Sequence, residues 1–141
     1  MRTYVLDASA LLRFTDKEPG FEKMRTLFQR AAMDECRLCM SAVNWGEVVT
    51  AISRHSGPQA SSILDNLAAL PMSVVPVDAG DAAEAGQFKL RYGVPYADAF
   101  AGAQTLKAAS GAEGGAILVT ADNDFRKIPR EVMQIEFLPG K

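Results

Sequence analysis

Carboxylates are the side chains of this sequence best suited to chemistry. Asp7 directly follows an apolar run near the N-terminus, and Asp122 and Asp124 come shortly after another apolar run. Glu47 and Asp98 lie in segments with helical patterns. Carboxylates gathered in a poorly solvated cleft repel one another unless a cation neutralises them. Because all-oxygen ligands favour hard divalent ions, such a cluster predicts a site for Mg²⁺ or Mn²⁺.

Two strands are expected to bring three of these acids together. Residues 4–6 and 116–119 are short apolar runs rich in β-branched side chains, as in strands buried on both faces of a parallel sheet. Open α/β sheets place their ligand sites at the carboxyl ends of such strands. We therefore expect the acids that follow the two runs to share one edge of a sheet.

Strands and helices alternate along the rest of the chain, which favours a parallel α/β sheet. We predict one α/β domain over residues 1–141, with a mainly parallel central sheet of four to five strands flanked by helices. The further strands are expected at 37–40, 72–77 and 133–137. The helices are expected at 8–14, 21–33, 41–55, 59–70, 79–92 and 96–109, with a flexible connection at 110–115.

The two helical acids also have plain structural explanations. Glu47 lies three residues after Asn44, so both border the apolar stripe of their helix. Asp98 falls in the first turn of its helix, where an anion is stabilised by the helix dipole. Asp7 and Asp122 each follow a predicted strand, where an Asp often serves as a helix cap or a turn residue. Independent caps do not explain why all these acids are expected at one edge of the sheet.

Composition sets the limits of the interpretation. The chain has 141 residues, is 48% hydrophobic and carries a formal charge of −2. It has 15 basic and 17 acidic residues. If the five candidate acids are set aside, 12 acidic residues remain, and the rest of the molecule is mildly cationic. The sequence shows no signal peptide or membrane-spanning run, and with only two cysteines a cytoplasmic protein is expected.

Four motifs, in this order, resemble those of PIN-domain nucleases. They are Val5-Leu6-Asp7-Ala8-Ser9, Asn44-Trp45-Gly46-Glu47, Tyr96-Ala97-Asp98-Ala99-Phe100 and Thr120-Ala121-Asp122-Asn123-Asp124-Phe125. Within that superfamily the chain is most similar to the VapC-type toxins of toxin–antitoxin pairs, and the resemblance covers nearly all of it.

This resemblance implies a Mg²⁺- or Mn²⁺-dependent endoribonuclease, the toxin of a type II toxin–antitoxin pair. Asp7, Glu47, Asp98 and Asp122 match the acidic quartet, as catalytic residues and metal ligands. The positions that assist the quartet in the family are matched by Thr120, Asp124, Ser9 and Asn44. The family further implies an RNA substrate, a cognate antitoxin and a homodimer. Basic residues near the expected acidic rim are candidates for RNA contact: Arg13, Lys89, Arg91, Arg126 and Lys127.

Three other interpretations remain to be weighed. An aspartyl-phosphate phosphatase also begins with an Asp after its first strand, but this chain has Ser9 where that class has a second Asp. Cys36 and Cys39 have redox or zinc spacing, but they run into a strand and have no partner cysteines. A non-catalytic module whose acidic groove binds a basic peptide is the main alternative, and metal-dependent cleavage separates it from a nuclease.

Overall fold

The structure, a computed structural model, describes residues 1–111 and 114–140 and has a single five-stranded sheet in that part of the chain. The strand order is β3-β2-β1-β4-β5, and every neighbouring pair is parallel. The strands are β1 (Thr3–Leu6), β2 (Arg37–Ser41), β3 (Ser73–Val75), β4 (Ala116–Thr120) and β5 (Gln134–Phe137). The helices are α1 (Ala8–Thr15), α2 (Phe21–Ala32), α3 (Ala42–His55), α4 (Ala60–Ala68), α5 (Ala79–Tyr92) and α6 (Tyr96–Gly111), with short 3-10 turns η1 (Gly57–Gln59) and η2 (Asn123–Lys127).

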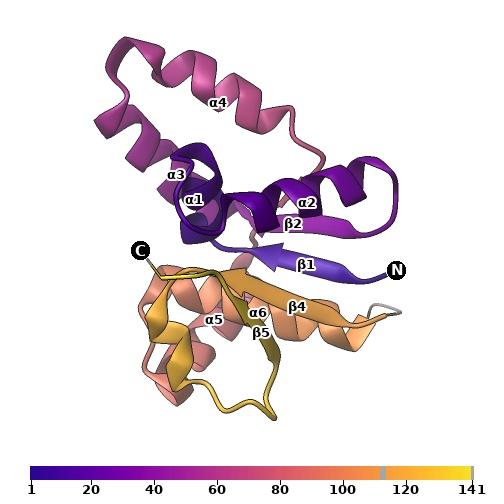
Figure 1. Ribbon diagram of the computed structural model, residues 1–141. Helices are drawn as coiled ribbons and strands as arrows, with labels where there is room; N and C mark the ends of the chain where they lie inside the picture. Colours follow the sequence, from indigo (N-terminus) through magenta and orange to yellow (C-terminus); the bar gives the residue numbers. More distant parts are fainter. Residues whose placement is uncertain (112–113, 141) are drawn as a thin grey trace.

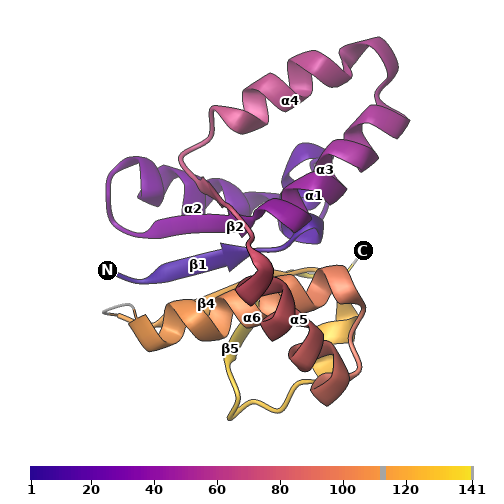
Figure 2. The same cartoon turned by 180° about the vertical axis from the view of Figure 1, so that it is seen from behind.

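Helices cover the sheet on both faces, as Figures 1 and 2 show. Side chains alternate along β1, so Tyr4 and Leu6 join the core beneath α1 to α4, while Val5 joins the core beneath α5 and α6. The pair α3 and α4 projects away from the sheet (Figure 1). No helix in the described ranges is long and apolar enough to cross a membrane.

The order of the strands fixes where a site can form. From β1 the chain adds β2 and β3 on one side of the sheet, and later β4 and β5 on the other. The carboxyl ends of β1 and β4 therefore meet where the direction of winding reverses, the usual place of ligand sites in open α/β sheets. The predicted α/β class and parallel sheet are confirmed.

Element boundaries shifted mostly at prolines and turns. The strand expected at 72–77 is only Ser73–Val75 and lies at the sheet edge, because Pro76 has no amide hydrogen for the ladder. The helix expected at 59–70 is the shorter α4, which follows the turn η1. Residues 112–113, in the middle of the connection expected at 110–115, lie outside the described residues.

The two cysteines lie on opposite faces of the sheet. Cys36 belongs to the core beneath α1 to α4, whereas Cys39 packs against the core beneath α5 and α6. Both are free thiols. Their Cys-x-x-Cys spacing therefore makes no redox pair here.

Candidate metal centre

Asp7 is held at the end of β1 by a network of hydroxyl groups. Its backbone amide extends the ladder to Val119 of β4, and its side chain caps α1 by accepting from the Ala10 amide at 2.9 Å. The Ser9 hydroxyl donates to Asp7 Oδ1 at 2.7 Å, and the Thr120 hydroxyl donates to Oδ2. Thr120 also accepts from the Asp122 amide at 2.9 Å. One hydroxyl thus links the Asp7 carboxylate to the backbone of Asp122, at the ends of two strands.

Burial makes this carboxylate hard to ionise. Asp7 is 2% exposed, and its desolvation raises its pKa to about 6, although the hydrogen bonds from Thr120 and Ser9 act in the opposite direction. A bound cation or further donors would compensate for the lost solvent and favour the charged form.

Asp98, in the first turn of α6, is at the centre of the acids. Desolvation, and then the charge and hydrogen bond of Asp122, raise the pKa of Asp98 to about 8, and the charges of Asp7 and Glu47 add to the rise. The four acids of the predicted quartet therefore act on one another across a short range. Without a cation, this arrangement favours the protonated form of Asp98.

The tightest group of oxygens comes from α6 and η2. Ligand oxygens of Asp98, Asp122 and Asp124 all lie within 4.8 Å of one another. Asp98 Oδ2 is buried and accepts no hydrogen bond from the residues that the structure describes, a costly state for an acceptor. Three close carboxylates with an unpartnered buried oxygen fit a hard divalent cation. Asp124, expected only to assist, is thus a ligand candidate equal to Asp122, since the η2 turn brings both to one side.

Glu47 approaches this group from α3. Its Oε1 accepts from Asn44 Nδ2 at 3.0 Å, and the same amide nitrogen donates to the Ala97 carbonyl at 3.1 Å. Asn44 is fully buried, so it ties Glu47 to the turn of α6 that carries Asp98. The spacing of Asn44 and Glu47 on one helix was visible in the sequence, but the contact with Ala97 was not.

The five basic candidates for RNA contact have different surroundings. Arg13 is buried, and its Nη1 donates to the carbonyls of Pro19 and Pro139 at 2.6 Å each, so it joins the chain end to the α1–α2 turn and does not face solvent. Lys127 lies nearest the acids, 3.6 Å from Asp124 Oδ1. The other three are exposed: Lys89, Arg91 and Arg126.

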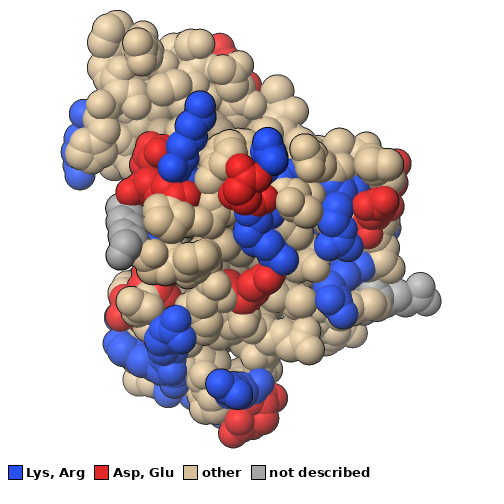
Figure 3. Space-filling view, viewed as in Figure 1, with Lys and Arg blue, Asp and Glu red and all other residues tan. Residues whose placement is uncertain are grey.

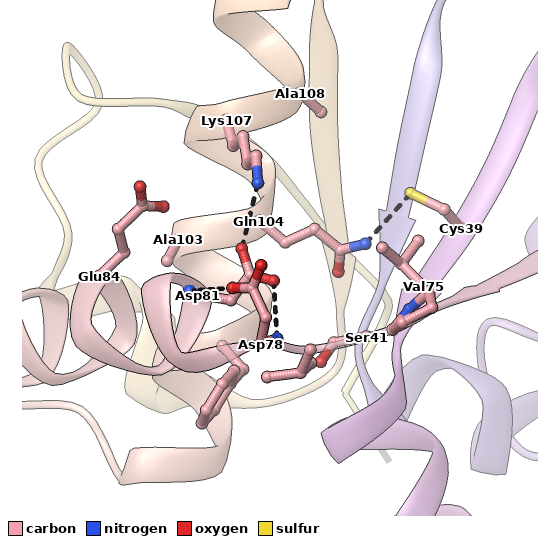
Figure 4. Close-up of a pocket in the computed structure, with 13 residues that line it drawn as sticks. Cys39, Ser41, Val75, Asp78, Asp81, Glu84, Ala103, Gln104, Lys107 and Ala108 are labelled. Atoms are coloured by element: carbon pink, nitrogen blue, oxygen red, sulfur yellow. Dashed lines mark hydrogen bonds and ion pairs between the residues drawn. The ribbon is translucent and has the colours of Figure 1, made fainter.

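A cavity that none of these clustered acids lines lies beside α6. This cavity of about 450 Å³ is bounded by α5, α6 and the β2–β3 edge (Figure 4). Asp78 and Asp81 at its rim form a reciprocal capping box at the start of α5, and Asp81 also pairs with Lys107 at 3.1 Å. Helix capping explains these acids, so the rim is no second metal centre.

The fold and the site together define an α/β protein with a carboxylate centre at its strand ends. The model of the PIN domain family matches residues 4–131, so the chain belongs to that family. A search of curated proteins finds no match.

Solved structures with the same fold include toxin–antitoxin complexes and a toxin. VapBC2 from Rickettsia felis, bound to a promoter DNA fragment, has a TM-score of 0.73 and 16% identity over 97% of this chain and 99% of that chain. DNA-bound VapBC from Salmonella typhimurium has a TM-score of 0.71 and 19% identity, over 97% of this chain and 98% of that chain. VapC20 from Mycobacterium tuberculosis, a toxin that cleaves the sarcin–ricin loop, has a TM-score of 0.65 and 17% identity, over 87% of this chain and 92% of that chain.

Proposed function

We propose that this protein is a metal-dependent endoribonuclease that hydrolyses RNA phosphodiester bonds. The observation that carries the proposal is the group formed by Asp98, Asp122 and Asp124, with its unpartnered buried oxygen, at the switch point of a PIN fold. Phosphodiester hydrolysis needs neutralisation of a charged substrate and an activated water. A bound Mg²⁺ or Mn²⁺ supplies both, as a Lewis acid that lowers the pKa of water.

The acidic side chains would have different roles around that ion. Asp98, Asp122 and Asp124 would hold it, and Asp7 adds negative charge from a position fixed by Thr120. Glu47 is held through Oε1, which leaves Oε2 to accept the proton of the attacking water. Such a site needs no histidine base.

The biological setting is part of the same proposal. We infer a cytoplasmic toxin of a type II toxin–antitoxin pair, because the chain belongs to the PIN family and shares its fold with toxin and antitoxin complexes along nearly its whole length. A cognate antitoxin and a homodimer are the expected assemblies. The acidic centre would attract a basic segment of the antitoxin, which would then exclude RNA.

Cleavage of total cellular RNA by the purified, antitoxin-free protein tests the activity. We expect discrete fragments with Mn²⁺, none with excess chelator, and none from the Asp7→Asn or Asp98→Asn variants, each of which removes a negative charge from the acidic centre. Asp65→Asn is the matched control, because it makes the same change on exposed α4, and it should cleave like the wild type.

A folded, metal-loaded wild type that leaves RNA intact would contradict the nuclease proposal. The remaining explanation would be a PIN-like module whose acidic groove binds a basic peptide without catalysis. Binding of a synthetic basic peptide that weakens in Asp98→Asn would then support that alternative.

A further inference from the structure

A cationic hollow lies along the edge strand β5. It has a volume of about 770 Å³ and is lined by residues of α2, β1, β4 and β5 and by the segment around η2. Asp122 caps η2 and Asp124 lies within it, while Arg126 of the same turn lines the hollow. The turn η2 thus contributes to both the acidic group and the lining of the hollow.

The charge of the hollow is opposite to that of the protein as a whole. Its lining includes the cations Arg2, Lys23, Arg126 and Arg130 and one anion, Glu136, which makes four positive charges against one negative charge. The full chain carries −2. Figure 3 shows Lys and Arg side chains interspersed with acidic side chains on the face where β4 and β5 lie.

Most of this positive charge is available to a ligand. Lys23 Nζ lies 2.8 Å from Glu136 Oε1, and these two charges cancel. Arg2, Arg126 and Arg130 have no ion pair with any residue in the ranges 1–111 and 114–140. Each of these three arginines offers phosphate oxygens several donors in a planar fork.

Arg126 is also preorganised. Its guanidinium carbon lies 4.0 Å from the centre of the Phe137 ring, and its Nε donates to Asn123 Oδ1 at 3.0 Å. These two contacts restrict the guanidinium, which lines the hollow. A flat guanidinium can stack with a nucleobase or bind a phosphate, and both contacts recur in the binding of single strands.

We propose that this hollow binds the backbone of a single-stranded RNA whose scissile phosphate lies at the metal centre. The inference rests on the proposed ribonuclease function and adds the path of the substrate. A flexible strand can bend over η2 into a hollow at a sheet edge, whereas a duplex is too stiff to follow it. Because phosphate contacts dominate, binding is largely independent of base sequence.

The test measures binding of a short fluorescein-labelled oligouridylate by anisotropy, with chelator present so that no cleavage occurs. The double variant Arg126→Ala/Arg130→Ala should bind several-fold more weakly than the wild type. Its slope of log Kd against log salt should fall by about 1.4, from about 0.7 for each lost phosphate contact with a single strand. Arg25→Ala/Arg54→Ala removes the same charge from exposed positions outside the hollow and should bind like the wild type.

Photocrosslinking of the wild type to a 4-thiouridine-labelled RNA gives a second measurement that needs no variant. Crosslinks should map to the peptide that contains Arg126 and Phe137. Unchanged affinity and salt slope in the double variant, no binding by the wild type, or crosslinks elsewhere would each overturn the inference. Metal-dependent cleavage of total RNA, measured in parallel, decides the proposed function separately, since that activity is read from the wild type whatever the binding result.

Discussion

At the scale of single residues, Thr120 has the most contacts with the candidate site. It is fully buried, donates to Asp7 and accepts from the amide of Asp122. We predict that Thr120→Val, which has nearly the same volume, lowers RNA cleavage about 10- to 100-fold, as expected when a group that orients a metal ligand is lost. Initial rates at saturating Mn²⁺ provide the measurement.

Thr105 offers a matched control for that change. It is also fully buried, but its hydroxyl donates to the Ala101 carbonyl within α6, at 2.8 Å. Thr105→Val should therefore keep the wild-type rate. Equal rates in both variants would show that the Thr120 hydroxyl has no role in positioning the acids.

At the scale of elements, α6 depends on small side chains to lie close to its neighbours. A Cβ at Gly102 would clash with the Phe88 ring of α5. We predict that Gly102→Ala destabilises the protein by about 1–3 kcal/mol, the usual cost of overpacking a core. Urea unfolding would measure the change.

The same packing predicts a rescue and a control. Shortening the neighbour in the double variant Gly102→Ala/Phe88→Leu should recover part of the loss. Gly86→Ala, in α5, meets no atom within 4 Å among the described residues and should be neutral or stabilising, because alanine is the better helix former. A fully stable Gly102→Ala protein would disprove the close contact.

At the scale of the whole molecule, the buried acids couple stability to pH. The pKa values of Asp7 and Asp98 are raised from 3.8 to about 6 and about 8, so the folded state binds protons more tightly than the unfolded state. This stabilisation is fully present below about pH 4 and is lost as the pH rises through 6 and 8. We predict that the Tm of the metal-free protein falls between pH 5 and pH 8, measured by thermal unfolding in chelator.

A divalent cation should reverse that trend. Metal binding needs ionised ligands, so the rise in Tm on adding Mn²⁺ should be larger at pH 8 than at pH 5. Asp98→Asn removes the main titrating group, and both effects should shrink in that variant. A Tm that is independent of pH in the wild type would mean that these carboxyls are not protonated in the folded state.

Local sequence patterns were enough to predict the elements and the acids at their ends. Hydrophobic period, prolines and caps are local properties, so β1, β4, α5 and the positions of Asp7 and Asp98 were predictable. The Thr120–Asp7 bond, by contrast, joins residues 113 positions apart. Such contacts follow from strand pairing, which a local pattern does not specify.

Which polar residues lie in contact depends on the tertiary structure. It grouped Asp124 with Asp98 and Asp122, buried Arg13 against two carbonyls, and placed Arg126 over Phe137. In each case the partner comes from a distant part of the chain or from a turn whose direction the packing sets. The residue types that make a metal centre are thus encoded locally, whereas their distances and their solvation exist only once the sheet has formed.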